Sequence, residues 1–336
     1  MPRSAPGFWQ SRGALAWSLF PLSLLFALLA GLRRRLFALG VLKPVRLPVR
    51  VVVVGNVAVG GSGKTPVVLW LVELLRSRGF TPGIVSRGYG GAVEGVAAVP
   101  IDGDPARFGD EPVMMASRSG CPVFVGRDRP AAGLALLEAH PDVDVLIADD
   151  GLQHYRLARD LEVVVVDEAT LGNCLRLPAG PLREGLGRVR EAGLVLAHGA
   201  LSERLSAKIR PVPVFQFGLA GSLFERLERR EERCGAAAFR GRRIHAMAGI
   251  GRPERFFSQL EGLGLSIRRR PFPDHHAFTA ADLGISDGDV LLMTEKDAVK
   301  CAPFAPADSW VWPVRAQVAP GAAELIVEKL DGPPTA

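Results

Sequence analysis

The chain has 336 residues, 48% of them hydrophobic, so its length and composition allow two ordinary folded domains. Its formal charge of +6 suits a nucleic acid, an anionic lipid or an acidic small molecule, and does not choose among them. The four cysteines, Cys121, Cys174, Cys234 and Cys301, form no CxxC pair, which argues against a zinc ribbon and against a disulfide scaffold.

The first predicted element is an apolar helix near the amino terminus. No charged residue occurs from Gly13 to Leu32, a stretch as long as a membrane-spanning helix. Arginines precede it and the triplet Arg33 to Arg35 follows it, so the positive-inside rule gives no orientation and a signal-peptide cleavage site is absent there. We expect residues 1–45 to form a membrane-associating helix in the interface and a basic linker; a membrane span and a buried core helix are the alternatives.

A strand, a glycine-rich loop and a helix come next. Val51 to Val54 is typical of a strand buried on both faces of a parallel sheet, and Pro66 to Arg78 predicts a helix with proline in its first turn. The sequence AVGGSGKT between them has P-loop spacing, with alanine at the position of the usual first glycine. We expect ATP to be bound by Ala58, Val59, Gly60, Gly61, Ser62, Gly63, Lys64 and Thr65.

Three kinds of residue give this loop its chemistry. Glycines allow backbone N–H groups to converge on phosphate oxygens. Lys64 brings a positive charge to the β- and γ-phosphates, and Thr65 can ligate magnesium. A chance glycine-rich turn is the alternative, but the loop lies between an apolar strand and a helix, as a P-loop requires.

Further apolar runs alternate with predicted helices at residues 83–86, 123–125, 143–148, 161–166 and 194–197. This alternation predicts an α/β fold with a doubly wound, mostly parallel sheet of the P-loop NTPase type. Asp149 and Asp150 end one of these strands, at the edge of the sheet where ligands bind, so we interpret them as magnesium-binding residues. An acidic pair at this position can also be a simple helix cap or turn.

A charged stretch from Glu225 to Arg233 interrupts the alternation, and apolar runs resume at Ile244 to Ala248. We interpret the stretch as a solvated helix face or a hinge, and place a domain boundary there. The prediction is a P-loop kinase domain over residues 46–224 and a smaller C-terminal α/β domain over residues 225–336 that closes over the active site.

Two motifs are ambiguous from their residues alone. Asp110 and Glu111, in GDEP, have the residue types of a catalytic site, but a turn capping the next helix has the same sequence. His275 and His276, in PDHHAF, fit an ordinary core or surface pair equally well.

Eight motifs, in this order, resemble the tetraacyldisaccharide 4'-kinase family, the lipid A kinases of Gram-negative envelopes. They are GNVAVGGSGKTP (55–66), SRGYG (86–90), GDEP (109–112), DDGLQH (149–154), LREG (182–185), AGIGRPERFF (248–257), PDHHAF (273–278) and TEKDAVK (294–300). The resemblance implies a kinase that uses ATP and Mg²⁺ to phosphorylate the 4'-hydroxyl of a tetraacylated glucosamine disaccharide 1-phosphate. It also implies a place at the cytoplasmic face of the inner membrane. We expect no nucleic-acid ligand and no obligatory protein partner.

The resemblance implies roles for individual residues as well. Asp110 and His275 match a catalytic base and its orienting group, and Glu111, Asp149 and Asp150 match positions near magnesium and the phosphates. Residues implied to contact the acceptor or the phosphates are Ser86, Arg87, Tyr89, Arg129, His154, Arg183 and Glu184.

Two other classes of protein are compatible with a P-loop. A membrane-attached nucleotide switch is one, but guanine recognition needs an NKxD loop, and TEKD has Lys296 directly before Asp297. A P-loop kinase of a soluble metabolite fits the catalytic motifs equally well, but leaves the amino-terminal helix without a purpose.

Overall fold

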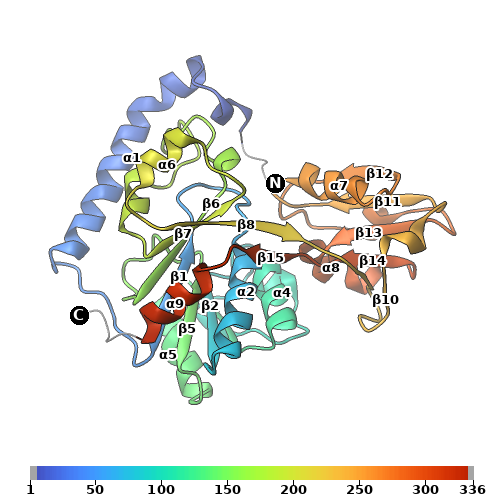
Figure 1. The fold of residues 1–336 in the computed structure, drawn as a ribbon, viewed down its shortest axis with the longest axis horizontal. Helices are drawn as coiled ribbons and strands as arrows, with labels where there is room; N and C mark the ends of the chain where they lie inside the picture. The colour runs from blue at the N-terminus through green and yellow to red at the C-terminus, as the bar shows by residue number, and fades with distance from the viewer. Residues whose placement is uncertain (1–5, 332–336) are drawn as a thin grey trace.

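The structure is a computed structural model, and it describes residues 6–331 of the chain. Two lobes lie side by side, each built on its own β-sheet (Figure 1). The first lobe has a nine-stranded sheet made of β1 (Arg50–Gly55), β2 (Pro82–Ser86), β3 (Val96–Ala98), β4 (Val123–Gly126), β5 (Val145–Asp149), β6 (Leu161–Val166), β7 (Leu194–His198), β8 (Val214–Ala220) and β15 (Arg315–Val318). Their order is β15-β8-β7-β6-β1-β5-β2-β4-β3. The edge strands β3 and β15 are antiparallel to their neighbours, whereas the strands between them run parallel, which confirms the predicted fold class.

Helices cover both faces of this sheet. They are α2 (Lys64–Ser77), α4 (Asp110–Ser119), α5 (Arg129–Ala139), α6 (Glu203–Ile209) and α9 (Ala322–Asp331), with the short α3 (Pro105–Phe108), η1 (Gly7–Gln10), η2 (Glu168–Thr170) and η3 (Leu186–Glu191) between other elements. Val52 and Val54 pack on the side of α2, and Val51 and Val53 pack on the side of α5. Because successive strand residues point to opposite faces, a strand covered on both sides needs an apolar residue at every position, as β1 has.

The second lobe is a smaller α/β unit, as predicted. Its sheet contains β9 (Phe224–Arg226), β10 (Arg233–Cys234), β11 (Ile244–Ala248), β12 (Ile267–Pro271), β13 (Val290–Thr294) and β14 (Ser309–Trp312), in the order β10-β9-β14-β13-β11-β12. Its helices are α7 (Pro253–Gly262), α8 (Glu295–Cys301), η4 (Ala236–Phe239), η5 (Ala280–Leu283) and η6 (Ala302–Phe304). Helix α8 packs against α4 of the first lobe, so the two lobes share an interface.

The chain crosses between the lobes twice, and the second crossing was not predicted. It leaves the first lobe after β8 and returns after β14 to form β15, which pairs with β8, and then α9 (Figure 1). Residues 315–331 therefore belong to the first sheet and its covering helices, not to the second lobe as the division at residues 225–336 supposed. A short strand with polar residues, Arg315 and Gln317, at alternate positions carries too weak an apolar signal to be assigned to a sheet from sequence.

The charged stretch at the predicted boundary is also different from what we expected. It forms β9, a turn and β10, an antiparallel hairpin rather than a helix face. Glu225 is buried, and its carboxylate forms ion pairs with three arginines: Arg118 of α4, Arg230 and Arg233. Several of these charges therefore pair with one another beside the crossing between the lobes.

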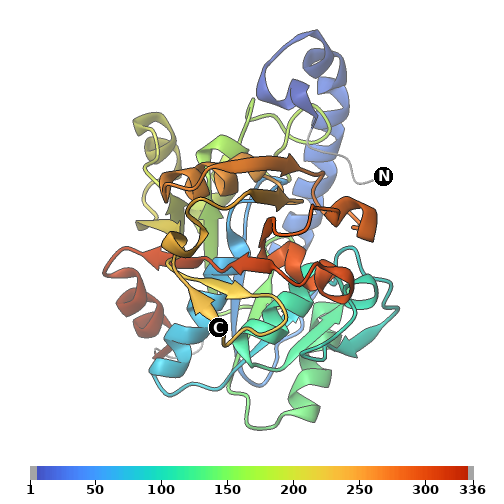
Figure 2. The same cartoon turned by 90° about the vertical axis from the view of Figure 1, so that its right-hand side faces the viewer.

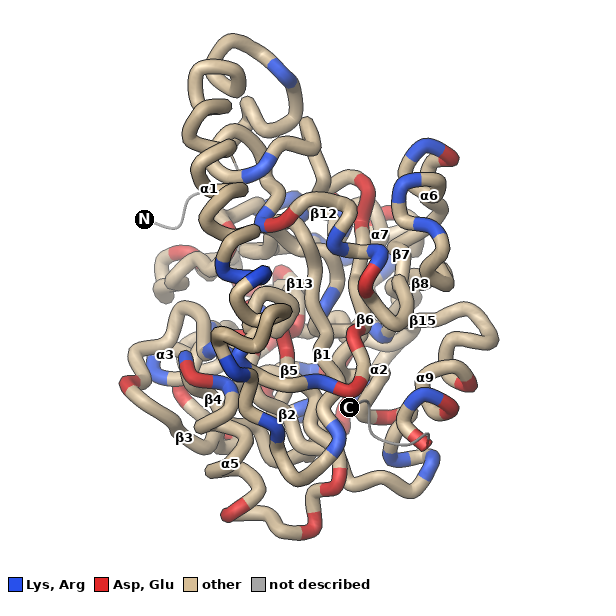
Figure 3. The backbone as a smooth tube through the Cα atoms, turned by 90° about the vertical axis from the view of Figure 1, so that its left-hand side faces the viewer, with Lys and Arg blue, Asp and Glu red and all other residues tan. Residues whose placement is uncertain are grey.

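Helix α1 (Ala14–Ala38) lies along the outside of the first lobe (Figure 1), and the amino-terminal segment extends beyond the rest of the fold (Figure 2). Helix α1 is tan along most of its length in Figure 3, in keeping with its apolar sequence. The Ser23 hydroxyl fixes it to the body, donating to the Arg176 carbonyl at 2.8 Å and accepting from the Ala179 N–H at 3.0 Å. Leu24 and Leu28 are 55% and 67% exposed, so α1 is not the buried core helix that was one alternative.

Candidate active site

The P-loop joins β1 to α2 at the carboxyl edge of the first sheet. Gly60 has a φ of +118° and Gly63 a φ of +87°, conformations that side-chain-bearing residues rarely adopt. Helix α2 begins at Lys64, two residues earlier than expected, with Gly63 as its N-cap and no side chain capping it. The first-turn N–H groups of α2, together with the helix dipole, therefore form a site suited to an anion.

Lys64 and the acidic pair after β5 meet at this edge. Lys64 Nζ lies 3.5 Å from Asp150 Oδ1, and Arg183 donates to Asp150 Oδ2 at 2.8 Å. Although burial opposes ionisation, these two cations hold the pKa of Asp150 at about 2. Asp150 has a φ of +47°, a strained conformation of the kind that gathers at functional sites.

Asp149 differs sharply from its neighbour. Its Oδ2 accepts from the Ser86 hydroxyl at 3.0 Å, whereas its Oδ1 is buried without a hydrogen-bond partner. Burial, and then the nearby charges of Glu111 and Asp150, raise the pKa of Asp149 to about 7. A buried carboxylate in this position has unsatisfied capacity for a cation.

Asp110 and His275, which sequence reasoning paired only by resemblance, are in contact across the two lobes. Asp110 is the first residue of α4, and its two carboxylate oxygens lie 3.1 and 3.0 Å from His275 Nδ1. Burial opposes the charge on Asp110, but the hydrogen bond from His275 and the charges of Lys296 and Lys300 hold its pKa at about 2. Burial lowers the pKa of His275, yet the hydrogen bond with Asp110 leaves that pKa raised.

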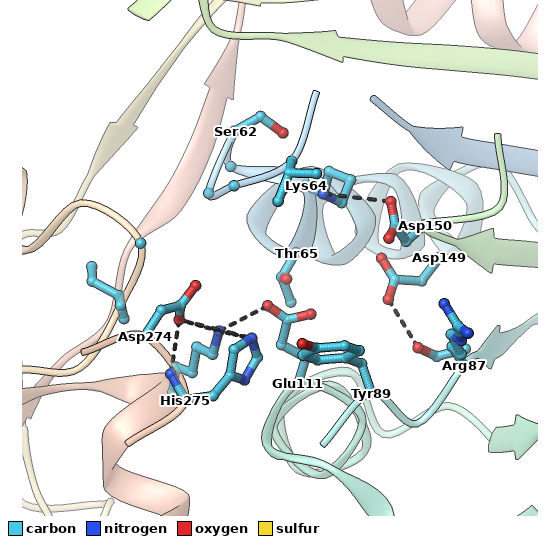
Figure 4. Close-up of a pocket in the computed structure, with 18 of the residues that line it drawn as sticks. Ser62, Lys64, Thr65, Arg87, Tyr89, Glu111, Asp149, Asp150, Asp274 and His275 are labelled. Atoms are coloured by element: carbon cyan, nitrogen blue, oxygen red, sulfur yellow. Dashed lines mark hydrogen bonds and ion pairs between the residues drawn. The ribbon is translucent and has the colours of Figure 1, made fainter. Parts of the chain in front are cut away.

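The backbone around this pair is adapted to hold it. His275 has a φ of +57°, a second strained residue that the surrounding structure holds in place. Gly109 has a φ of +92°, and a side chain there would meet the Tyr89 carbonyl at 2.6 Å. The SRGYG loop thus packs directly on GDEP, and the Tyr89 ring lies edge-on to His275 with centroids 5.1 Å apart (Figure 4).

Lys296 is the functional candidate that sequence reasoning missed. Its Nζ lies 3.1 Å from Glu111 Oε1, 3.0 Å from Asp274 Oδ1 and 3.3 Å from His275 Nε2. Burial disfavours its charge, but Glu111, Asp110 and Asp274 raise its pKa overall. The only sequence signals for this role are the place of Lys296 in the TEKDAVK motif and that of Asp274 in PDHHAF, and neither motif by itself indicates that the two residues meet.

One cavity of about 1180 Å³ connects these groups. It is bounded by the P-loop, by both lobes and by α1 residues Phe26, Leu29 and Arg33. The predicted residues that line it are Val59, Gly60, Gly61, Ser62, Gly63, Lys64, Thr65, Ser86, Arg87, Tyr89, Glu111, Arg129, Asp149, Asp150, His154, Arg183, Glu184 and His275. Ala58 and Asp110 are not among the lining residues: Ala58 forms a bridge with Leu182, and Asp110 contacts His275, which does line the cavity.

Some predicted contact residues are already engaged by the protein. Arg129 is buried and donates to the Gly126 carbonyl at 2.9 Å, and its burial lowers its pKa to about 10. His154 Nε2 lies 3.4 Å from the Arg129 amide, and burial followed by the charge of Arg129 lowers the histidine pKa to about 4. Glu184 accepts a hydrogen bond from the Tyr155 hydroxyl. These three residues line the cavity, and contacts within the protein already hold their side chains in its wall.

A P-loop at a strand–helix junction, an acidic pair at the neighbouring strand end and a carboxylate–imidazole pair beside them define a P-loop phosphotransferase. Comparison with known proteins narrows the class. The chain belongs to the tetraacyldisaccharide-1-P 4'-kinase family, whose family model matches residues 15–331.

Curated relatives and a solved structure agree with this family. The chain is 62% identical over 337 residues to the tetraacyldisaccharide 4'-kinase of Aromatoleum aromaticum, covering 100% of both chains. It is 59% identical to that of Azoarcus sp., covering 97% of this chain and 95% of the relative. Its fold is similar to that of LpxK from Aquifex aeolicus, whose crystal structure is described as an "apo" form in complex with ATP. The TM-score is 0.79 at 29% identity, covering 94% of this chain and 99% of the other.

Proposed function

We propose that this chain transfers the terminal phosphoryl group of ATP to the 4'-hydroxyl of a tetraacylated glucosamine disaccharide 1-phosphate, a lipid A precursor. The main support for the proposal is one continuous cavity, which runs from the P-loop, past His275, to the apolar helix α1. It offers one space for a nucleotide, a sugar hydroxyl and acyl chains. The activity named for the relatives and the ATP in the related structure support the same assignment.

Magnesium fits the residues at this site. The candidate donors, Thr65, Glu111, Asp149 and Asp150, present the hard oxygens that this ion prefers. Asp150 already forms ion pairs with Lys64 and Arg183, and Glu111 forms one with Lys296. In contrast, Asp149 Oδ1 is buried without a hydrogen-bond partner. We therefore assign Asp149 as the nearest carboxylate, with Thr65 beside the phosphates.

No ready-made cluster of three acidic, histidine or cysteine ligands occurs within residues 6–331. Mg²⁺ usually keeps several waters and takes only one or two protein carboxylates, with substrate phosphates completing its shell. When bound with ATP, it would neutralise part of the charge that develops on the transferred phosphoryl group.

Residues of this chain position the nucleotide and accept the proton of the attacking hydroxyl. The P-loop amides and Lys64 hold the triphosphate in place, which removes much of the entropy cost of the reaction. As the 4'-oxygen attacks the γ-phosphorus, the bond from that phosphorus to the β-phosphate oxygen breaks and ADP leaves. The hydroxyl proton passes to the Asp110–His275 pair, in which His275 faces the cavity. Lys296 holds the imidazole in position from the opposite ring nitrogen.

A membrane location follows from the same proposal. Helix α1 is long and apolar enough to cross a membrane by length and composition, and only 11% of its most apolar window is buried in the protein. An acylated, anionic acceptor resides in a bilayer, and the exposed leucines with the following arginines suit an interface rich in anionic lipid. We place the enzyme at the cytoplasmic face of the inner membrane, where ATP is available.

The test is direct. Purified protein in detergent micelles is incubated with magnesium, γ-labelled ATP and a tetraacyldisaccharide 1-phosphate, and the lipids are separated. Labelled, bisphosphorylated lipid is the expected product. Vigorous ATP hydrolysis without labelled lipid contradicts the proposal and favours a nucleotide switch. Labelling of a deacylated sugar phosphate in preference to the lipid favours a kinase of a soluble metabolite.

A further inference from the structure

Two arginines of the second lobe reach across to one aspartate of the first. Arg252 is the N-cap of α7 and Arg255 lies in its first turn. Their guanidinium groups donate to the same oxygen, Asp167 Oδ2, at 2.8 and 2.5 Å. Asp167 directly follows β6 and is buried. The chemistry described above uses none of these three residues.

This contact lies beside the phosphate-binding loop. Strand β6 is the neighbour of β1, so Asp167 and the P-loop occupy the same carboxyl edge of the sheet. The turn before α7 touches the P-loop backbone: a side-chain carbon on Gly251 would lie 3.0 Å from the Gly61 nitrogen. Arg252 and Arg255 line the same cavity as Lys64. The second lobe thus holds two cations close to the place where the triphosphate is expected.

The charge at this contact is unbalanced. One carboxylate faces two guanidinium groups, and its other oxygen accepts the Ala169 N–H at 3.1 Å. Burial, and then the charge of Arg255, lower the pKa of nearby His198, whereas Asp167 raises it. Arginine presents a rigid fork of donors that matches phosphate oxygens, and arginines commonly stabilise the charge of a transferring phosphoryl group. A triphosphate is therefore a better partner for this pair than one shared carboxylate oxygen.

We propose that Arg252 and Arg255 contact the phosphates of the bound nucleotide, and that Asp167 is a competing partner that holds them beside the P-loop until ATP binds. This inference rests on the proposed function, because it takes ATP to be the ligand. The competing explanation is a purely structural clasp, in which the ion pairs only hold the lobes together.

The two explanations predict opposite changes in ATP affinity for Asp167→Asn. If the arginines bind phosphate, Arg255→Gln should weaken ATP binding by roughly tenfold, since a charged hydrogen bond is lost, and Arg252→Gln by somewhat less because Arg252 is more exposed. Asp167→Asn, which keeps an acceptor for the Ala169 amide, should instead tighten ATP binding by several-fold, because the competing charge is gone. A structural clasp predicts that Asp167→Asn and Arg255→Gln weaken binding together.

The measurement is calorimetric titration of the full-length protein in micelles with magnesium and ATP, repeated with ADP. Arg268→Gln, an exposed arginine of β12 in the same lobe, is the matched control and should bind ATP like the wild type. Opposite shifts for Asp167→Asn and Arg255→Gln support the inference. An Arg255→Gln affinity within twofold of wild type, or parallel losses in the two variants, overturns it. Lipid phosphorylation by the wild type is assayed alongside. Its absence with ATP binding intact counts against the proposed function alone.

Discussion

Asp149 and Asp150 are adjacent in the chain, yet their carboxyl pKa values lie on opposite sides of the ordinary value, about 7 against about 2. The difference comes from partners rather than from sequence. Lys64 and Arg183 form ion pairs with Asp150, whereas Asp149 accepts one hydrogen bond from the Ser86 hydroxyl, and the charges of Glu111 and Asp150 outweigh that of Lys64 in their effect on its pKa. The sequence predicts an acidic pair at a strand end, but a one-dimensional pattern cannot say which of the two carboxylates forms the ion pairs.

This asymmetry makes the stability of the metal-free protein depend on pH. The folded pKa of Asp149 lies above its unfolded value near 4, so the folded state binds more protons between about pH 4 and 7. The contribution of this group to stability therefore falls as pH rises through that window. In EDTA, Asp149→Asn should melt several degrees above wild type at pH 8 and close to it at pH 5, measured by thermal denaturation.

Magnesium provides the control for this prediction. With ATP present at pH 8, added Mg²⁺ should raise the melting temperature of the wild type more than that of Asp149→Asn, because binding to the folded state stabilises it by mass action. Equal magnesium effects in the two proteins would remove Asp149 from the metal's shell. A variant that melts below wild type at pH 8 in EDTA would show that the carboxylate is not destabilising there.

At the scale of single elements, the strongest sequence signals were those that local chemistry determines. The valine run forms the doubly covered strand β1, and Gly60 and Gly63 of the P-loop have the positive φ values that glycine accepts easily. The hairpin at Glu225 to Cys234 and the return strand β15 were missed. Both are short, and they are held by partners far away in sequence, such as Arg118 for Glu225, which no local pattern reveals.

The two crossings between the lobes meet at Gly221. A side chain at this position would lie 2.4 Å from the Pro313 carbonyl oxygen and 2.7 Å from the Trp312 ring, so the two crossing segments must separate to admit it. Gly221→Ala should therefore lower the free energy of unfolding by about 1–3 kcal/mol, the usual cost of overpacking. Urea denaturation followed by tryptophan fluorescence measures it, since Trp312 is adjacent.

Gly218→Ala is the matched control for the crossing. Gly218 lies in β8, three residues earlier, and a side-chain carbon there meets nothing within 4 Å. It should be neutral or slightly stabilising, because alanine restricts the unfolded chain more than glycine does. If both variants unfold at the same urea concentration as wild type, the close approach at Gly221 is not a constraint on the crossing.

The whole molecule combines an exposed apolar helix with a cleft between two lobes. Because Leu24 and Leu28 are exposed while Ser23 docks on the body, the proposed membrane-binding surface can be changed without removing the helix. The double substitution Leu24→Glu with Leu28→Glu should weaken binding to vesicles of anionic phospholipid by at least about tenfold, through lost apolar burial and added charge. Flotation of the protein with the vesicles measures the effect.

Leu134→Glu serves as its control, because Leu134 is half exposed on α5 and contributes nothing to α1. It should float with vesicles like the wild type. Basal ATP hydrolysis should survive in the α1 variant, since the P-loop is untouched. Full retention on vesicles by the double variant would mean that another surface anchors the protein.

The site as a whole illustrates what the sequence could and could not predict. The P-loop was recognisable from spacing, whereas Asp110 and His275, 165 positions apart, were ambiguous by themselves and were paired only by resemblance to a family. The role of Lys296 was missed because it depends on Asp274 beside it and on Glu111 of the other lobe. Contacts between distant segments are created by the fold, so residues whose function lies in such contacts leave little trace in a local pattern.

A double-mutant cycle tests whether the two lobes assemble Asp110 and His275 into one catalytic unit. The turnover number for lipid phosphorylation is measured for wild type, Asp110→Ala, His275→Ala and the double variant. His276→Ala is the control, because this neighbour packs against Phe272 and Phe278 rather than Asp110. Each single variant should lose about 100-fold to 10,000-fold, the usual contribution of a positioned acid or base. The turnover number of the double variant should be no lower than that of the slower single variant, because removing either residue already disables the pair. A double loss equal to the product of the two single losses would mean that Asp110 and His275 act independently and do not form one catalytic unit.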